Sequence, residues 1–180
     1  MALPLTVGDW PPAPIRTERL VLRPPEARDR PLVIDLGCDP EVNRYTGGGR
    51  DRAQLEADMP ATPADRPGQF IVEHEGGFVG WFGVSRHDPD RPGRVLPDGG
   101  ELELSYVTPA AAWGRGFATE AGTAVLDWVD ARFDEPVVLC TQVANRASRR
   151  LAARLGFVEA DRFEEFGAEQ WFGVRHPRSR

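Results

Sequence analysis

The chain has 180 residues and a mass of 19.9 kDa, which suits a single domain. Hydrophobic residues make up 41% and charged residues 28%, proportions that are typical of a folded globular protein and exclude a disordered chain. The net charge of −6 predicts no nucleic-acid partner, and no apolar run reaches the ~20 residues that a membrane span needs.

The N-terminal residues 1–15 are rich in proline and predict an extended arm, so that residues 16–180 form the single domain. The arm lacks the basic residues and the apolar core of a signal peptide, so we expect a cytoplasmic protein with no membrane partner. Residues 19–23 then alternate as a strand does. Apolar spacing predicts a helix over residues 29–38, and a second, short helix is expected over residues 51–59.

Two β-rich runs flank a Gly-Gly turn and predict a hairpin from residues 70–74 and 78–84. After a turn-rich loop, residues 101–107 alternate as a strand, with Glu101, Glu103 and Ser105 on its polar face. The second half predicts a helix over 116–133, a strand over 137–140, a helix over 145–156, and strands over 157–163 and 170–175. These elements predict one mixed α/β domain.

The most informative segment runs from Trp113 to Glu120, where a Gly-Arg-Gly turn leads into a helix. Such a turn presents unpaired N–H groups and the positive end of the helix, a combination that binds phosphate. Arg115 adds a charge and Thr119 a hydroxyl. The segment does not fit a dinucleotide-binding fingerprint, because Thr119 stands where that motif requires a third glycine or alanine. It is not a P-loop either, because the chain has no lysine. An ordinary helix start with turn glycines is the alternative interpretation.

Residues 109–121, PAAAWGRGFATEA, resemble the acetyl-CoA pyrophosphate loop of the GNAT N-acetyltransferases, in the version typical of the RimJ/RimL-like branch. Three further segments resemble motifs of that branch in the expected order. They are the opening strand at residues 17–23, the fourth strand at 103–106, and the last helix, with Asn-Arg-Ala-Ser at 145–148 and Leu-Gly-Phe at 155–157. The match covers roughly residues 16 to 175.

This resemblance implies a GNAT-like α/β (α+β) single domain with a mixed, mostly antiparallel sheet flanked by helices. Its fourth and fifth strands would run parallel and splay apart to admit acetyl-CoA, the cosubstrate, with no metal. The implied cofactor-binding residues are Tyr106, Val107, Thr108, Trp113, Gly114, Arg115, Gly116, Phe117, Ala118, Thr119 and Asn145. Ala111 stands where the family often has Gln or Arg, and we expect it to weaken cofactor affinity.

Acetyl transfer to an amine requires the ammonium, with a pKa near ~10.4, to lose a proton. Glu103 is the candidate base, acting through a water, and Glu101 is the alternative on the same face; the non-catalytic interpretation is a pair of solvated carboxylates. The backbone N–H near Val107 would stabilise the oxyanion. The tyrosine that many GNAT enzymes use as proton donor is replaced by Ala152, so Ser148 is the candidate donor, with water or a purely structural role as alternatives.

Several other residues are assigned to structure rather than chemistry. His74, His87 and His176 have no metal-ligand spacing and are expected on the surface, and Cys140 is expected in the core. With only Cys38 and Cys140, the chain can form neither a disulfide scaffold nor a four-cysteine zinc site. Aromatic residues that are expected in the core or an interface, with an acceptor pocket as the alternative, are Trp10, Trp81 and Trp171.

The predicted function is an acetyl-CoA-dependent N-acetyltransferase that moves an acetyl group to a primary amine by direct transfer in a ternary complex. The alternative is a non-catalytic acyl-CoA-binding sensor or interaction domain, which Ala111 and Ala152 favour and Glu103 disfavours. The resemblance allows a protein N-terminus, a small-molecule amine or an aminoglycoside-like antibiotic as acceptor, and also a homodimer. The acceptor-facing segments are expected at residues 37–68 and 86–100.

Overall fold

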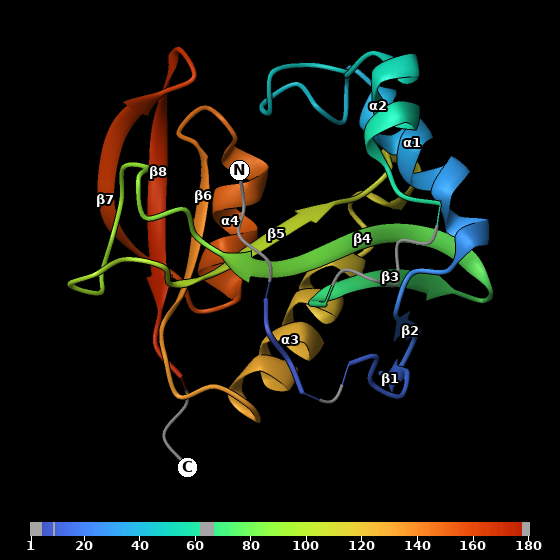
Figure 1. Ribbon diagram of the computed structural model, residues 1–180, viewed down its shortest axis with the longest axis horizontal. Helices are drawn as coiled ribbons and strands as arrows, with labels where there is room; N and C mark the ends of the chain where they lie inside the picture. The colour runs from blue at the N-terminus through green and yellow to red at the C-terminus, as the bar shows by residue number, and fades with distance from the viewer. Residues whose placement is uncertain (1–4, 9, 62–66, 178–180) are drawn as a thin grey trace.

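The computed structural model describes residues 5–8, 10–61 and 67–177. An eight-stranded sheet with the order β1-β2-β3-β4-β5-β6-β8-β7 forms its centre (Figure 1). The strands are β1 Ile15–Arg16, β2 Leu20–Arg23, β3 Gln69–His74, β4 Gly77–Arg86, β5 Leu102–Val107, β6 Val137–Gln142, β7 Val158–Glu165 and β8 Ala168–Arg175. The helices are α1 Arg30–Cys38, α2 Arg52–Asp58, α3 Phe117–Asp130 and α4 Arg146–Arg154, with 3₁₀ turns η1 Ala27–Asp29 and η3 Ala110–Ala112.

The parallel neighbours β5 and β6 pair only at their first residues. Leu102 faces Val137 and Glu103 faces Val138, and no later pair forms between the two strands. On their outer sides, β5 pairs with β4 and β6 pairs with β8 over six residues each, in both cases antiparallel. Figure 1 shows the consequence, because β6, β8 and β7 stand at the left while β2 to β5 run to the right. The expected mixed, mostly antiparallel sheet with a splayed parallel pair is confirmed.

The main core lies between the sheet and the helices α3 and α4. Alternate strand residues such as Leu22, Phe70 and Leu104 are buried there against the apolar stripe of α3. The described part of the arm joins this core, because Leu5 is 2% exposed and the Trp10 ring packs edge-on against Phe70. The core position expected for Trp10 is therefore confirmed. None of the helices in the described ranges is long and apolar enough to cross a membrane.

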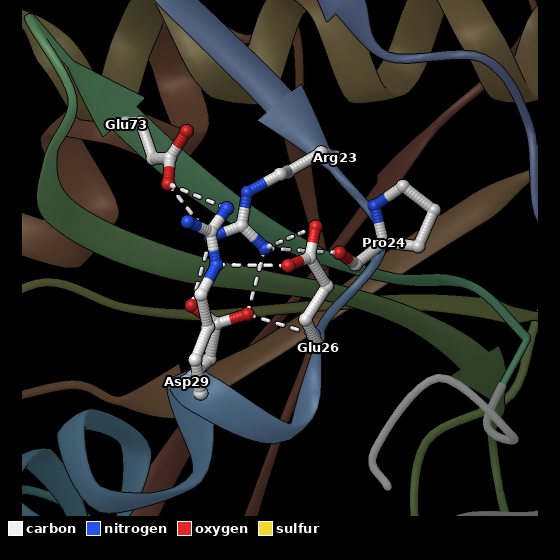
Figure 2. A network of polar contacts seen from close by, with 6 residues as sticks. Arg23, Pro24, Glu26, Asp29 and Glu73 are labelled. Carbon is white, nitrogen blue, oxygen red and sulfur yellow. Dashed lines mark hydrogen bonds and ion pairs between the residues drawn. The ribbon is translucent and has the colours of Figure 1, made fainter.

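A buried ion-pair network holds α1 to the sheet (Figure 2). Arg23 ends β2 and is 7% exposed. Its Nη1 and Nη2 atoms donate to the two carboxylate oxygens of Asp29 at 2.7 and 2.8 Å, and Nη2 also donates to Glu73 of β3 at 2.6 Å. Burial alone would raise the pKa of Asp29, but the hydrogen bonds from Arg23 and from the Glu26 N–H hold that pKa below its usual value. The start of α1 is thereby fixed to β2 and β3.

Replacing Arg23 by alanine should lower the free energy of unfolding by about 3–5 kcal/mol, because two carboxylates then lose their buried counter-charge. Arg28→Ala is the matched control, since the Arg28 side chain is 64% exposed beside Glu26 and should cost less than about 1 kcal/mol. Urea unfolding of both variants measures the difference. Equal losses would show that the Arg23 network does not hold α1.

Candidate active site

The loop between β5 and α3 presents a row of free backbone donors. Gly114 and Gly116 adopt φ angles of 73° and 82°, which favour glycine, and Gly116 caps α3. The N–H groups of residues 114–118 have no acceptor among the described residues. The N–H of Trp113, which was also expected to face the cofactor, instead donates to the Ala110 carbonyl at 3.0 Å. Five consecutive donors at the N-terminus of a 14-residue helix form a site suited to an anion.

A clamp from the residues just before β2 holds this loop in shape. Glu120, in the first turn of α3, accepts hydrogen bonds from Thr17 Oγ1 at 2.5 Å and from the N–H and Nε of Arg19 at 2.9 and 2.7 Å. Arg19 Nη1 also donates to the Arg115 carbonyl at 3.0 Å. Sequence reasoning matched both motifs but missed that they meet, because about a hundred residues separate them. The Thr-x-Arg pattern and the acid in the first helical turn were the available signal.

A chain of side-chain hydrogen bonds bridges the gap between β5 and β6. The Tyr106 hydroxyl lies 2.6 Å from Ser148 Oγ on α4. The Ser148 N–H donates to Asn145 Oδ1, which caps α4, and Asn145 Nδ2 donates to Thr141 Oγ1 on β6 at 3.3 Å. Burial raises the pKa of Tyr106, with the Ser148 hydrogen bond opposing it, so the phenol keeps its proton at neutral pH. The structure thus brings the predicted Ser148 and Asn145 to the open part of the splay, together with the Tyr106 side chain.

The expectation that His87 lies on the surface is wrong, because the loop after β4 folds back over the sheet and buries it completely. His87 Nδ1 lies 3.0 Å from Glu103 Oε2, and Nε2 lies 3.2 Å from the Pro92 carbonyl. Both ring nitrogens face acceptors, an arrangement that favours the doubly protonated ring. The hydrogen bond with Glu103 raises the pKa of His87 above its usual value of 6.5, although burial opposes the shift.

The alternation of side chains along β4 could have predicted that His87 lies on the same face as Glu103. Ser85 pairs with Glu103 across β4 and β5, so the residue two positions further along points to the same face. His74 also differs from the surface prediction, because it is half-buried, with its ring centroid 4.6 Å from that of Phe117. His176 is exposed, as expected.

The two candidate carboxylates are both buried, so the interpretation that they are solvated is wrong. Glu101 Oε1 accepts the N–H groups of Val95 and Leu96 at 2.5 and 2.7 Å and anchors the loop. Glu101 Oε2 is buried without a hydrogen-bond partner among the described residues. Glu103 is also held at one oxygen, Oε2, by His87 and at 3.9 Å from Arg91. Oε1 of Glu103 has no hydrogen-bond partner within the described part of the chain and is not sealed from solvent. Of the two, Glu103 is therefore the carboxylate with an oxygen that reaches solvent, whereas Glu101 is completely buried.

Cys140 lies near this carboxylate but is inert. It is half-buried, and burial, followed by the charge of Glu103, raises the pKa of its thiol to about 12. The thiol is therefore protonated at neutral pH and is a poor nucleophile. No group of three or more metal-ligating side chains is found among the described residues.

A cavity of about 330 Å³ lies between α1 and α2 and the face of the sheet opposite the main core. Trp81 and Val107, which pair across β4 and β5, line its sheet side, and residues of α1, α2 and the segment joining them line the other. Part of the expected acceptor-facing segment 37–68 therefore borders it. Of the three tryptophans, Trp81 lines the cavity, Trp171 is buried in the core, and the half-buried Trp10 packs against the core.

A family model described as an acetyltransferase (GNAT) domain matches residues 19–158. The chain belongs to the GNAT acetyltransferase family. It is 28% identical over 149 residues to the Bacillus subtilis (strain 168) protein YkkB, covering 78% of this chain and 82% of that protein.

Solved structures confirm the GNAT fold. An acetyltransferase from Agrobacterium tumefaciens superposes with a TM-score of 0.72 at 24% identity, covering 96% of this chain and 99% of that one. Spermidine N-acetyltransferase from Vibrio cholerae, in complex with CoA and spermine, superposes with a TM-score of 0.70 at 20% identity, covering 89% and 97%. The single GNAT-like α/β domain expected from the sequence is confirmed.

Replacing His87 by alanine should lower the free energy of unfolding by about 2–3 kcal/mol near pH 6, because Glu103 loses its buried donor. The folded-state pKa of His87 is raised, so its stabilisation is complete below pH 6.5 and is lost as the pH rises through the folded value. Urea unfolding at about pH 6 and about pH 9 should therefore give a larger loss at the lower pH. His176→Ala, at an exposed histidine, is the control. A loss independent of pH would contradict the ion pair.

Proposed function

We propose that this protein is an acetyl-CoA-dependent N-acetyltransferase that moves an acetyl group to a primary amine by direct transfer in a ternary complex. The observation that carries the proposal is the gap between β5 and β6, which leads to the five free N–H groups of residues 114–118. The Thr17 and Arg19 contacts with Glu120 join two of the motifs on which the RimJ/RimL-like resemblance rests, and they support that assignment.

The residues present fit acetyl-CoA. The edge of β5 beyond Glu103 has no strand partner toward β6, so the backbone of Tyr106, Val107 and Thr108 is available to an extended pantetheine arm. The free N–H groups from Gly114 to Ala118, with Thr119 beside them, suit the pyrophosphate. Asn145 and Ser148 then border the thioester end of the gap. The structure of the Vibrio cholerae spermidine N-acetyltransferase, which holds CoA and spermine, supports the same use of the fold.

Glu103 is proposed as the base. Acetyl-CoA supplies the acetyl group as a thioester, so the C–N bond to the amine forms as the C–S bond breaks. Glu103 Oε1 takes the ammonium proton through a water, while His87 holds Oε2 and fixes the carboxylate. The Val107 N–H would stabilise the oxyanion. Because both groups stand on the face that borders the cavity, we propose that the acceptor enters through that cavity.

The leaving thiolate needs a proton, and the usual tyrosine position is Ala152, which is fully buried. The Tyr106–Ser148 pair places a phenol and a hydroxyl at the same helix, 2.6 Å apart. We propose that this pair supplies the proton, with Ser148 passing it from Tyr106 to the sulfur. Solvent then restores the proton to the pair.

Acetyl-CoA and CoA, but not NAD, should raise the thermal unfolding temperature, because a ligand at about 100 times its Kd adds roughly 2.7 kcal/mol of stability. Arg19→Ala should weaken CoA binding about 5- to 10-fold, since the clamp on Glu120 and the Arg115 carbonyl is lost. Arg162→Ala, which removes a similarly exposed ion pair with Glu159, should not change binding. Absence of any CoA-dependent shift would reject the cofactor site.

Glu103→Gln should lower kcat by about 10²- to 10³-fold while the shift with acetyl-CoA remains, because glutamine keeps the hydrogen bond to His87 but accepts no proton. CoA release with a panel of primary amines measures the rate. An unchanged rate would remove Glu103 as the base. Binding of acetyl-CoA without release by any amine would identify the chain as the non-catalytic acyl-CoA sensor instead.

A further inference from the structure

The cavity under α1 and α2 also indicates the class of acceptor, an inference that rests on the proposed acetyltransferase function. We infer that the acceptor is a monoamine whose amine is attached to an uncharged, apolar body, aromatic or branched aliphatic. A polyamine or an aminoglycoside, which carries several positive charges, does not fit this site. Three features of the cavity carry the inference: its floor, its walls and its charge.

The floor is an indole ring that lies flat along the sheet. A Cβ added at Gly83 would come within 2.6 Å of Trp81 Cη2, so the ring covers Gly83 and only glycine leaves room for it. Across the strand pair, Trp81 faces Val107, Gly83 faces Ser105, and Ser85 faces Glu103. The indole therefore extends from the level of Val107 toward that of Glu103. An apolar body stacked on the ring would direct its amine to the proposed base.

The walls are apolar and rigidly placed. Val33 and Leu36 of α1 and Leu55 of α2 line the cavity above the indole. The Arg23–Asp29 ion pair fixes the start of α1 to the sheet, so these side chains form a preformed wall. The volume of about 330 Å³ is at the small end of the range for small-molecule sites. A compact acceptor suits these dimensions better than a multi-ring sugar.

The charge of the cavity opposes a polycation. The described residues that line it include neither aspartate nor glutamate, and its one charged group, Arg50, is paired with Asp58 at 3.0 Å. The cavity's uncharged polar side chains are Asn43 and Gln69, and Asn43 is used internally, because its Nδ2 donates to the Leu36 carbonyl at 2.7 Å and to the Asp39 carbonyl at 2.9 Å. Additional ammonium groups would lose their water here without gaining a counter-charge.

Of the carboxylates near the cavity, only one can interact with an ammonium group of the acceptor. Glu165 on β7 is bound at both oxygens by Arg91, at 2.9 and 2.7 Å. Glu101 is occupied by backbone N–H groups. Glu101 Oε2 has no partner either but is completely buried, so of these carboxylates only Glu103 keeps an unpartnered oxygen that is not sealed from solvent among the described residues. A single amine can thus be deprotonated beside the floor, and this matches an acceptor with one positive charge.

The test compares 2-phenylethylamine and isoamylamine with spermidine and kanamycin, using the full chain at saturating acetyl-CoA and measuring CoA release. The apolar amines should give kcat/KM at least about 10-fold above the polycations. Trp81→Ala should raise KM for 2-phenylethylamine about 10-fold with KM for acetyl-CoA unchanged, and Trp81→Phe should restore most of the loss. Trp171→Phe, in the core on the other face, is the control and should change neither KM.

Calorimetric titration of the same amines into protein saturated with CoA separates the two proposals, because it needs no turnover. If 2-phenylethylamine binds and Trp81→Ala weakens that binding, the acceptor class is supported, even if no CoA is released. In that case only the proposal of enzymatic acetyl transfer fails. Equal or better binding or turnover of spermidine or kanamycin would overturn the acceptor class while acetyl transfer stands. No binding of either apolar amine would also overturn it.

Discussion

The splay between β5 and β6 is the feature on which the rest of the site depends. Each strand is paired along its outer side over six residues, yet the two share only the pairs at Leu102 and Glu103. Because the outer partners hold both strands, the gap cannot close by a small shift of either one. Backbone groups along the open edge of β5 then lack the partners that such groups require when they are removed from water. An extended ligand that can supply alternating donors and acceptors fits this edge.

Two arginines, Arg19 just before β2 and Arg23 at its end, hold elements that surround the site. Arg19 binds Glu120 and the carbonyl of Arg115, and so determines the shape of the anion-binding loop. Arg23 binds Asp29 and Glu73, and so determines the position of α1 above the cavity. Both use the planar guanidinium group to reach two acceptors at once, which a lysine ammonium does less well. One short strand thereby connects the loop before α3 to the wall of the cavity.

The two buried carboxylates, Glu101 and Glu103, have different surroundings, and these suit them to different roles. Glu101 and Glu103 stand two residues apart on the same face of β5, and both lie beneath the loop that follows β4. Glu101 accepts two backbone N–H groups of that loop, so its role is to hold the loop in place. Glu103 is held at one oxygen by His87 and its other oxygen is not sealed from solvent, whereas the second oxygen of Glu101 is completely buried. A carboxylate with one fixed and one available oxygen is suited to proton transfer.

Local patterns in the sequence were sufficient for the elements and for the loop. The two-residue and 3.6-residue periods predicted the strands and helices within a few residues, since burial of one face is a local requirement. The two glycines before a helix, Gly114 and Gly116, predicted a turn with free N–H groups. The structure confirms the turn, because both residues adopt positive φ angles that favour glycine. The position of Ser148 and Asn145 near the gap was implied by the resemblance to the GNAT family and not by a local pattern.

Tertiary structure alone decided which distant groups meet. His87 became a buried partner of Glu103, Thr17 and Arg19 met Glu120, and Trp81 became the floor of a cavity. These contacts depend on strand register and on the path of a long loop, and neither is encoded in the period of a single element. A pattern along one strand indicates which face is covered, but the identity of the covering group requires the fold.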